Sequence, residues 1–159
     1  KAANDVPCLP DTKIITGPHR TDSRFMAVHF LGRMHYGEAV RAFIKHVDWE
    51  YKLPNRDPGD RMAKGPILDY PCAVVLHSRG TRALLPIFGA LERDPPPSDK
   101  AMELYAWLVI LAYEYIGGDQ EAIQLVEMRA KRAENNKHLL LLLEKVKEIV
   151  EQRALEREA

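Results

Sequence analysis

The sequence predicts an all-α protein built from about three stacked helical hairpins and one further helix. Caps, breakers and apolar residues mark seven helical segments, several of which have apolar residues at spacings of three and four positions, the pattern of amphipathic helices. Very short and longer connections alternate between these segments, which favours helix pairs over a bundle. Because one hairpin cannot bury its own apolar face, about three stacked hairpins are the minimum that forms a core.

An extended arm precedes one helical domain in the expected organisation. Residues 1–20 hold several prolines and little periodic apolar content, so we expect an extended N-terminal arm there. A chain of 159 residues has about the commonest size of a single domain, so residues 21–159 are expected to form one helical-repeat domain.

Caps and breakers define the first pair of helices. Residues 21–23 are good N-cap residues, and the first helix is expected to run to about His35. Gly37 ends it, and a second helix is predicted over residues 39–47. Residues 53–66 are rich in proline and glycine, so they are expected to form a loop between two pairs.

Prolines and small turn residues define the second pair. Pro71 suits the first position of a third helix, because its φ is fixed and it lacks an N–H, and this helix ends near Gly80. Thr81 is the expected cap of the fourth helix, which places Pro86 close to the helix start, where a missing N–H costs little.

The remaining helices complete the predicted stack. Ser98 is expected to cap a fifth helix over residues 99–116, which is apolar on nearly every side and should be the centre of the core. Asp119 caps a sixth helix that runs towards Asn135. The final helix, over residues 138–157, has one apolar stripe and is expected to cap the stack.

One turn pattern occurs three times, in which glycine is followed by alanine and an apolar residue at the start of a second helix. The alanines are Ala39, Ala83 and Ala122, separated by 44 and 39 residues. This period resembles HEAT or armadillo-type repeats over about residues 22–134, and the stretch from Gly80 to Phe88 looks most like a HEAT unit.

The resemblance implies a right-handed α-solenoid-like stack with a C-terminal capping helix. The second helices of such a stack line a concave surface that binds a protein or peptide. Two departures, the long loop at residues 53–66 and the short third helix, leave both a regular solenoid and a compact bundle open.

The function expected from these features is a non-catalytic interaction or scaffolding module without a cofactor. Polar and apolar positions off the buried stripes of the second helices are the candidate partner contacts: Arg41, Lys45, Arg82, Leu85, Gln124 and Glu127. Trp49 and Tyr51 are suited either to anchor an interface or to roof the core.

Composition argues against other partners. Lysine plus arginine equals aspartate plus glutamate at 23 each, so no overall field favours nucleic acid. The longest apolar run, residues 104–116, is shorter than the roughly 20 residues of a membrane span. The first residues fit removal of a signal peptide and fit a trimmed cytoplasmic chain equally well, so the compartment stays open.

Two alternative functions stay open. A small metal-dependent enzyme would need His29, His35 and His46 to converge, although their spacing does not suit one helix face. A structural subunit could instead dock through the apolar stripe of the final helix, from Leu139 to Val150. No nucleophile or phosphate-binding motif occurs in the sequence.

The two cysteines also have two interpretations. Cys8 and Cys72 would form a disulfide that fixes the N-terminal arm to the third helix in an exported protein. Otherwise both are unpaired thiols, and Cys72 fills space in the core.

Overall fold

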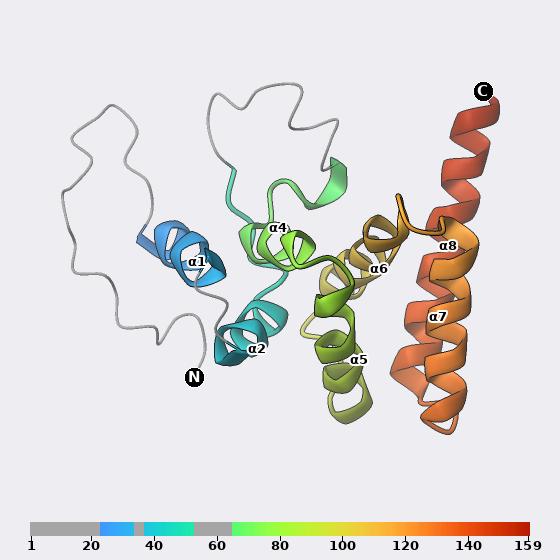
Figure 1. The fold of residues 1–159 in the computed structure, drawn as a ribbon, viewed down its shortest axis with the longest axis horizontal. Coiled ribbons are helices and arrows are strands. Elements are labelled where there is room, and N and C mark those ends of the chain that lie inside the picture. Colours follow the sequence, from blue (N-terminus) through green and yellow to red (C-terminus); the bar gives the residue numbers. More distant parts are fainter. Residues whose placement is uncertain (1–22, 34–36, 53–64) are drawn as a thin grey trace. The chain divides into compact units, whose positions relative to one another are not determined.

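The computed structural model of the chain describes residues 23–33, 37–52 and 65–159, and this part is helical without any strand (Figure 1). The predicted all-α class is confirmed. The predicted arm at residues 1–20 and most of the predicted loop at residues 53–66 lie outside the described residues. The structure divides into two compact units, residues 1–76 and 77–159. One domain over residues 21–159 therefore stays a prediction.

Unit 1 contains α1 (Ser23–Arg33), α2 (Gly37–Lys45), the 3-10 helix η1 (Gly65–Ile67) and α4 (Pro71–Ser78), which ends just past the unit boundary. α1 packs against α2, as expected for the first hairpin. The segment after α2 is tied to the turn that follows η1, because the Tyr51 N–H donates to the Asp69 carbonyl at 2.7 Å.

Gly32 lets α1 approach α4 closely. A Cβ atom built on Gly32 would lie 2.6 Å from Val75 Cγ1, which is shorter than real contacts of a Cβ atom. Since Val75 is buried, this contact requires a residue without a side chain on α1.

Unit 2 contains the 3-10 helix η2 (Gly80–Ala83), α5 (Leu84–Arg93), α6 (Asp99–Tyr113), α7 (Asp119–Arg132) and α8 (Lys137–Glu158). α6 is the most completely buried helix among these, as expected for the centre of the core. α7 and α8 lie side by side (Figure 1), and α8 also packs on α6 and α5.

The apolar stripe of α8 is used inside unit 2. Its buried members are Leu139, Leu142, Leu143, Val146 and Ile149. α8 thus contributes to the same core as α5, α6 and α7, and a docking role for α8 would have to use its other faces.

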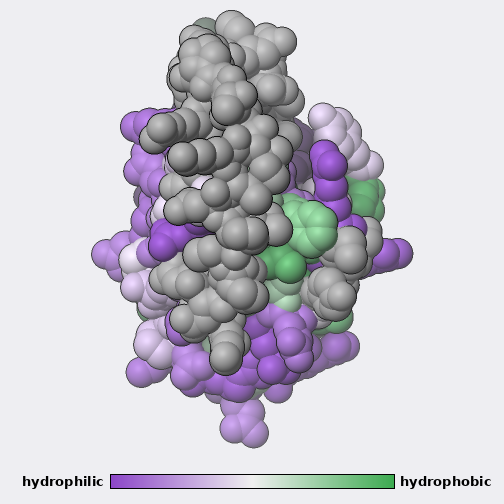
Figure 2. Space-filling model, turned by 90° about the vertical axis from the view of Figure 1, so that its left-hand side faces the viewer, coloured by the Kyte–Doolittle hydropathy of each residue, from purple (hydrophilic) through white to green (hydrophobic). Residues whose placement is uncertain are grey.

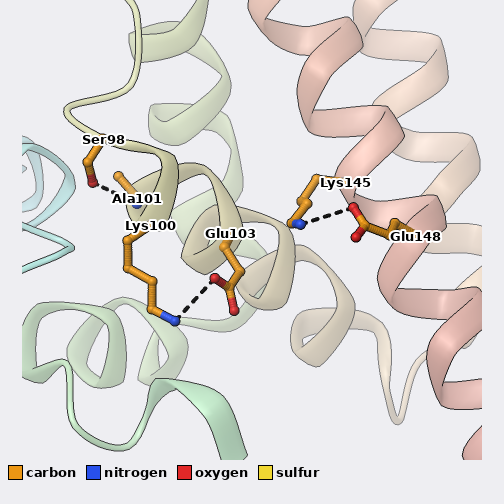
Figure 3. A network of polar contacts seen from close by, with 6 residues as sticks. All are labelled: Ser98, Lys100, Ala101, Glu103, Lys145 and Glu148. Atoms are coloured by element: carbon orange, nitrogen blue, oxygen red, sulfur yellow. Dashed lines mark hydrogen bonds and ion pairs between the residues drawn. The ribbon is translucent and has the colours of Figure 1, made fainter.

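Two helix starts in unit 2 are fixed by side-chain caps. Ser98 Oγ accepts from the Ala101 N–H at 3.1 Å, as expected for the start of α6. Figure 3 shows this cap beside the ion pair between Lys100 and Glu103, with the pair between Lys145 and Glu148 on α8. α8 begins after Asn136, whose side-chain oxygen accepts hydrogen bonds from the N–H groups of His138 and Leu139.

Three predicted boundaries in unit 2 were wrong. Thr81 lies within η2 and does not cap α5, because the chain makes a tighter turn before α5 begins. α6 ends at Tyr113 and not at residue 116, since three N–H groups beyond it turn back onto the Tyr113 carbonyl. Asp119 is the first residue of α7, and the cap is Gly118 with a φ of 82°.

The connection between α7 and α8 replaces the last predicted turn of the sixth helix. α7 ends at Arg132, and Glu134 and Asn135 have φ values of 54° and 58°, in the left-handed region that rarely suits side chains. The Asn135 N–H donates to the Ala130 carbonyl at 2.8 Å, which closes the end of α7.

Candidate interaction surfaces

The first two predicted contact residues lie on the outward face of α2. Arg41 and Lys45 are both exposed and four residues apart, so they occupy the same side of the helix. The opposite side of α2 is buried through Val40, Phe43 and Ile44. This surface offers two cations on one side of the helix.

The second pair lies where η2 continues into α5. Arg82 is exposed, and the Leu85 side chain is 63% exposed even though it belongs to the first turn of α5. Its helix neighbours Ile87 and Phe88 are fully buried. Arginine is enriched at protein interfaces, so this exposed pair is a candidate contact.

The third pair lies on α7. Gln124 is exposed and Glu127 is half-buried, on positions other than the buried Ala122, Val126 and Ala130. The structure therefore places the six predicted residues as three local pairs. Arg41 and Lys45 belong to unit 1, and the other four residues belong to unit 2.

The turn between α6 and α7 carries two exposed apolar residues that the sequence interpretation placed in the core helix. Tyr115 is 94% exposed and Ile116 is 67% exposed. The N–H groups of Ile116, Gly117 and Gly118 all donate to the Tyr113 carbonyl, at 3.2, 3.2 and 2.8 Å. Gly117 and Gly118 were the available signal in the sequence, because a glycine pair directly after Ile116 marks the end of α6 close to these side chains.

An arginine on α8 forms ion pairs with a carboxylate at each end of this turn. Arg153 Nη1 lies 3.2 Å from Asp119 Oδ1, and its Nη2 lies 3.3 Å from Glu114 Oε1. The guanidinium carbon is also 6.0 Å from the centre of the Trp107 ring. Only 16% of the Arg153 side chain is exposed, so solvent weakens these ion pairs less than at an open surface.

A cluster of rings lies in unit 1, on α1 and the segment after α2. Phe25 stacks on Tyr51 with ring centres 5.1 Å apart and meets His29 edge-on at 4.4 Å. Trp49 lies 5.7 Å from Tyr51, and the Arg24 guanidinium lies 5.0 Å from the Trp49 ring. All four ring side chains are half-buried, which fits the roofing interpretation of Trp49 and Tyr51.

Cys72 is a fully buried thiol on α4. Burial raises its pKa to about 12, with Arg24 opposing the rise and Asp48 adding to it. Since the thiolate is the reactive form, Cys72 is a poor nucleophile at neutral pH. Cys8 lies outside the described residues, so the disulfide between them stays a prediction.

The described residues give no metal site. Within residues 23–33, 37–52 and 65–159, no three histidine, cysteine, aspartate or glutamate side chains gather as ligands. His35 lies outside this part, and His29 packs against the Phe25 ring. In the same ranges, no helix combines the length and apolarity that would let it cross a bilayer.

Comparisons of the chain with protein-family models, with characterised proteins and with solved structures find no match. The candidate function therefore depends on the surfaces described above.

Proposed function

We propose that the chain is a non-catalytic protein-interaction or scaffolding module of helical-hairpin repeats, which binds a protein or peptide through outward positions of its second helices. The proposal includes the right-handed α-solenoid-like arrangement that the HEAT-like and armadillo-type resemblance implies. Two helix pairs that such repeats require, α1 with α2 and α6 with α7, pack within their own units.

The observation that carries the proposal is the exposure of Leu85 next to Arg82. With 63% of Leu85 exposed on the first turn of α5, apolar area of this side chain stays in contact with water. A partner that covers Leu85 recovers that area, and Arg82 can pair with an acidic group at the rim.

The test is a pull-down from native lysate with three purified baits. The baits are the unchanged chain, the double variant Arg82→Glu/Leu85→Ser, and the control Leu141→Ser, which changes a leucine of 51% exposure on α8. We expect the unchanged chain and the control to capture the same protein, and the double variant to lose it. Equal capture by all three baits contradicts the proposed surface.

A second variant tests the face on unit 1, and elemental analysis tests the alternative function. Arg41→Glu/Lys45→Glu reverses both cations of α2 without touching its buried side. Metal at about one atom per chain in the same preparation, with no partner captured, would replace the interaction module by a metal-dependent function.

A further inference from the structure

The three most exposed large apolar side chains of the described residues lie at one end of unit 2. They are Tyr115 at 94%, Leu155 at 68% and Ile116 at 67%. The ion pairs of Arg153 place this part of α8 beside the turn between α6 and α7. We call this end, residues 114–121 and 151–158, the acidic tip.

Hydrogen bonds and ion pairs connect the two parts of the tip. The Tyr113 carbonyl gathers three N–H groups of the turn, and Arg153 binds a carboxylate before the turn and another after it. Arg157 Nη1 adds a contact of 3.8 Å to Asp119 Oδ2. Apolar side chains presented on a fixed backbone lose little conformational freedom on binding, which favours their use as anchors.

The charge around these side chains is unbalanced. The tip contains six carboxylates, on Glu114, Asp119, Glu121, Glu151, Glu156 and Glu158, against two arginines, Arg153 and Arg157. Both arginines are already engaged with Asp119, and Arg153 also with Glu114. The chain as a whole is neutral, so this excess of negative charge is local.

These features select the chemistry of a partner. An anionic bilayer would be repelled by the carboxylates, although tyrosine and isoleucine suit a membrane interface. A segment that is rich in lysine or arginine on one side and apolar on the other would cover the exposed apolar side chains of the tip and pair with its carboxylates. Figure 2 shows one face of the molecule, on which the described residues are mainly hydrophilic and hydrophobic ones form a few separate patches.

We propose that the acidic tip is a second binding site, at which Tyr115 and Ile116 anchor a basic amphipathic segment of another protein. The carboxylates of the acidic tip pair with the lysine or arginine side chains of that segment. This site uses other residues than the outward positions of the second helices, so it does not depend on the proposed function.

The test uses the full chain, labelled with nitrogen-15, and a synthetic amphipathic helix of leucine and lysine as the probe. Titration followed by amide resonances should shift signals of residues 114–121 and 151–158. The variant Tyr115→Ser/Ile116→Ser should weaken binding at least about tenfold, as expected for loss of central anchors. Leu141→Ser is the control, since it also replaces an exposed apolar residue of unit 2 by serine, at 51% exposure on α8 outside the tip, and should bind like the unchanged chain.

Two further probes separate the charge and membrane explanations. A peptide with glutamate in place of every lysine should not bind, and vesicles of zwitterionic and anionic phospholipid should not sediment the chain. The proposal fails if the lysine peptide leaves the tip unshifted, if the glutamate peptide binds equally well, if the double variant binds unchanged, or if vesicles sediment the chain through Tyr115 and Ile116. Circular dichroism of each variant confirms that unit 2 stays folded, which the exposure of both residues leads us to expect.

Discussion

The Asn136 side chain links the start of α8 to the end of α5, and its replacement should measurably destabilise unit 2. Its Oδ1 accepts from the N–H groups of His138 and Leu139 at 2.9 and 3.4 Å, at the start of α8. Its Nδ2 donates to the Glu92 carbonyl at the end of α5, at 3.2 Å. Losing the cap costs about 1 kcal/mol, and losing the half-buried hydrogen bond to Glu92 about 1 more. Asn136→Ala should therefore lower the free energy of unfolding by about 2 kcal/mol.

Asn136→Asp separates the two contributions. Aspartate keeps the acceptor for the two N–H groups but cannot donate to the Glu92 carbonyl. The expected loss is about 1 kcal/mol, reduced by roughly 0.5 kcal/mol because a carboxylate is favoured at a helix N-terminus.

Urea denaturation followed by far-ultraviolet circular dichroism gives these values, with Gln120→Ala as a control at an exposed position of α7. The control should change stability by less than about 0.5 kcal/mol. A loss for Asn136→Ala no larger than that of the control would refute the capping role. Equal losses for the alanine and aspartate variants would refute the division between the cap and the bond to Glu92.

Four other changes have expected outcomes. Ser98→Ala removes the cap of α6 and should cost about 1 kcal/mol in the same urea assay, whereas Ser98→Asp should retain most of the stability. Glu134→Gly relieves a φ of 54° and should raise the unfolding free energy by about 0.5–1 kcal/mol; a loss of stability would show that the turn is unstrained. Gly32→Ala should lower the free energy of unfolding by about 1 kcal/mol, because the clash with Val75 exceeds the gain in helix propensity. In a double-mutant cycle, Val75→Ala should reduce the cost of Gly32→Ala; additive effects of the two changes would exclude the close contact. The Cys72 thiol ionises near pH 9 in the unfolded chain, whereas burial raises its pKa to about 12 in the folded chain. The free energy of unfolding should therefore fall as the pH rises from about 9 to about 12 in reducing buffer, and Cys72→Ala should flatten this fall.

Local signals in the sequence predicted the helices well where one residue type decides a boundary. Ser98 after three prolines predicted the start of α6, and Pro71 predicted the start of α4, because each effect depends only on nearby backbone. Thr81 misled because a cap residue cannot by itself distinguish an α-helix from the 3-10 turn that precedes α5.

Local patterns predict only one feature of the tip, the end of α6 that the pair Gly117 and Gly118 marks. Tyr115 and Ile116 continue the apolar character of α6, and only the tertiary structure shows that they extend past the helices that cover it. Arg153 lies 34 and 39 residues from its two partners, so no spacing rule on one helix could pair them. The six predicted contact residues were chosen by helix face, and five of them are exposed because amphipathic spacing does predict which side of a helix faces solvent.

The order of the helices along the chain bears on how unit 2 is made in the cell. During synthesis α5, α6 and α7 leave the ribosome before α8, yet α8 supplies the stripe that packs against all three. Until α8 follows, the apolar sides of these helices face water and offer a binding surface to chaperones. A nascent chain paused before Asn136 would therefore still expose the apolar residues that α8 covers in the complete unit.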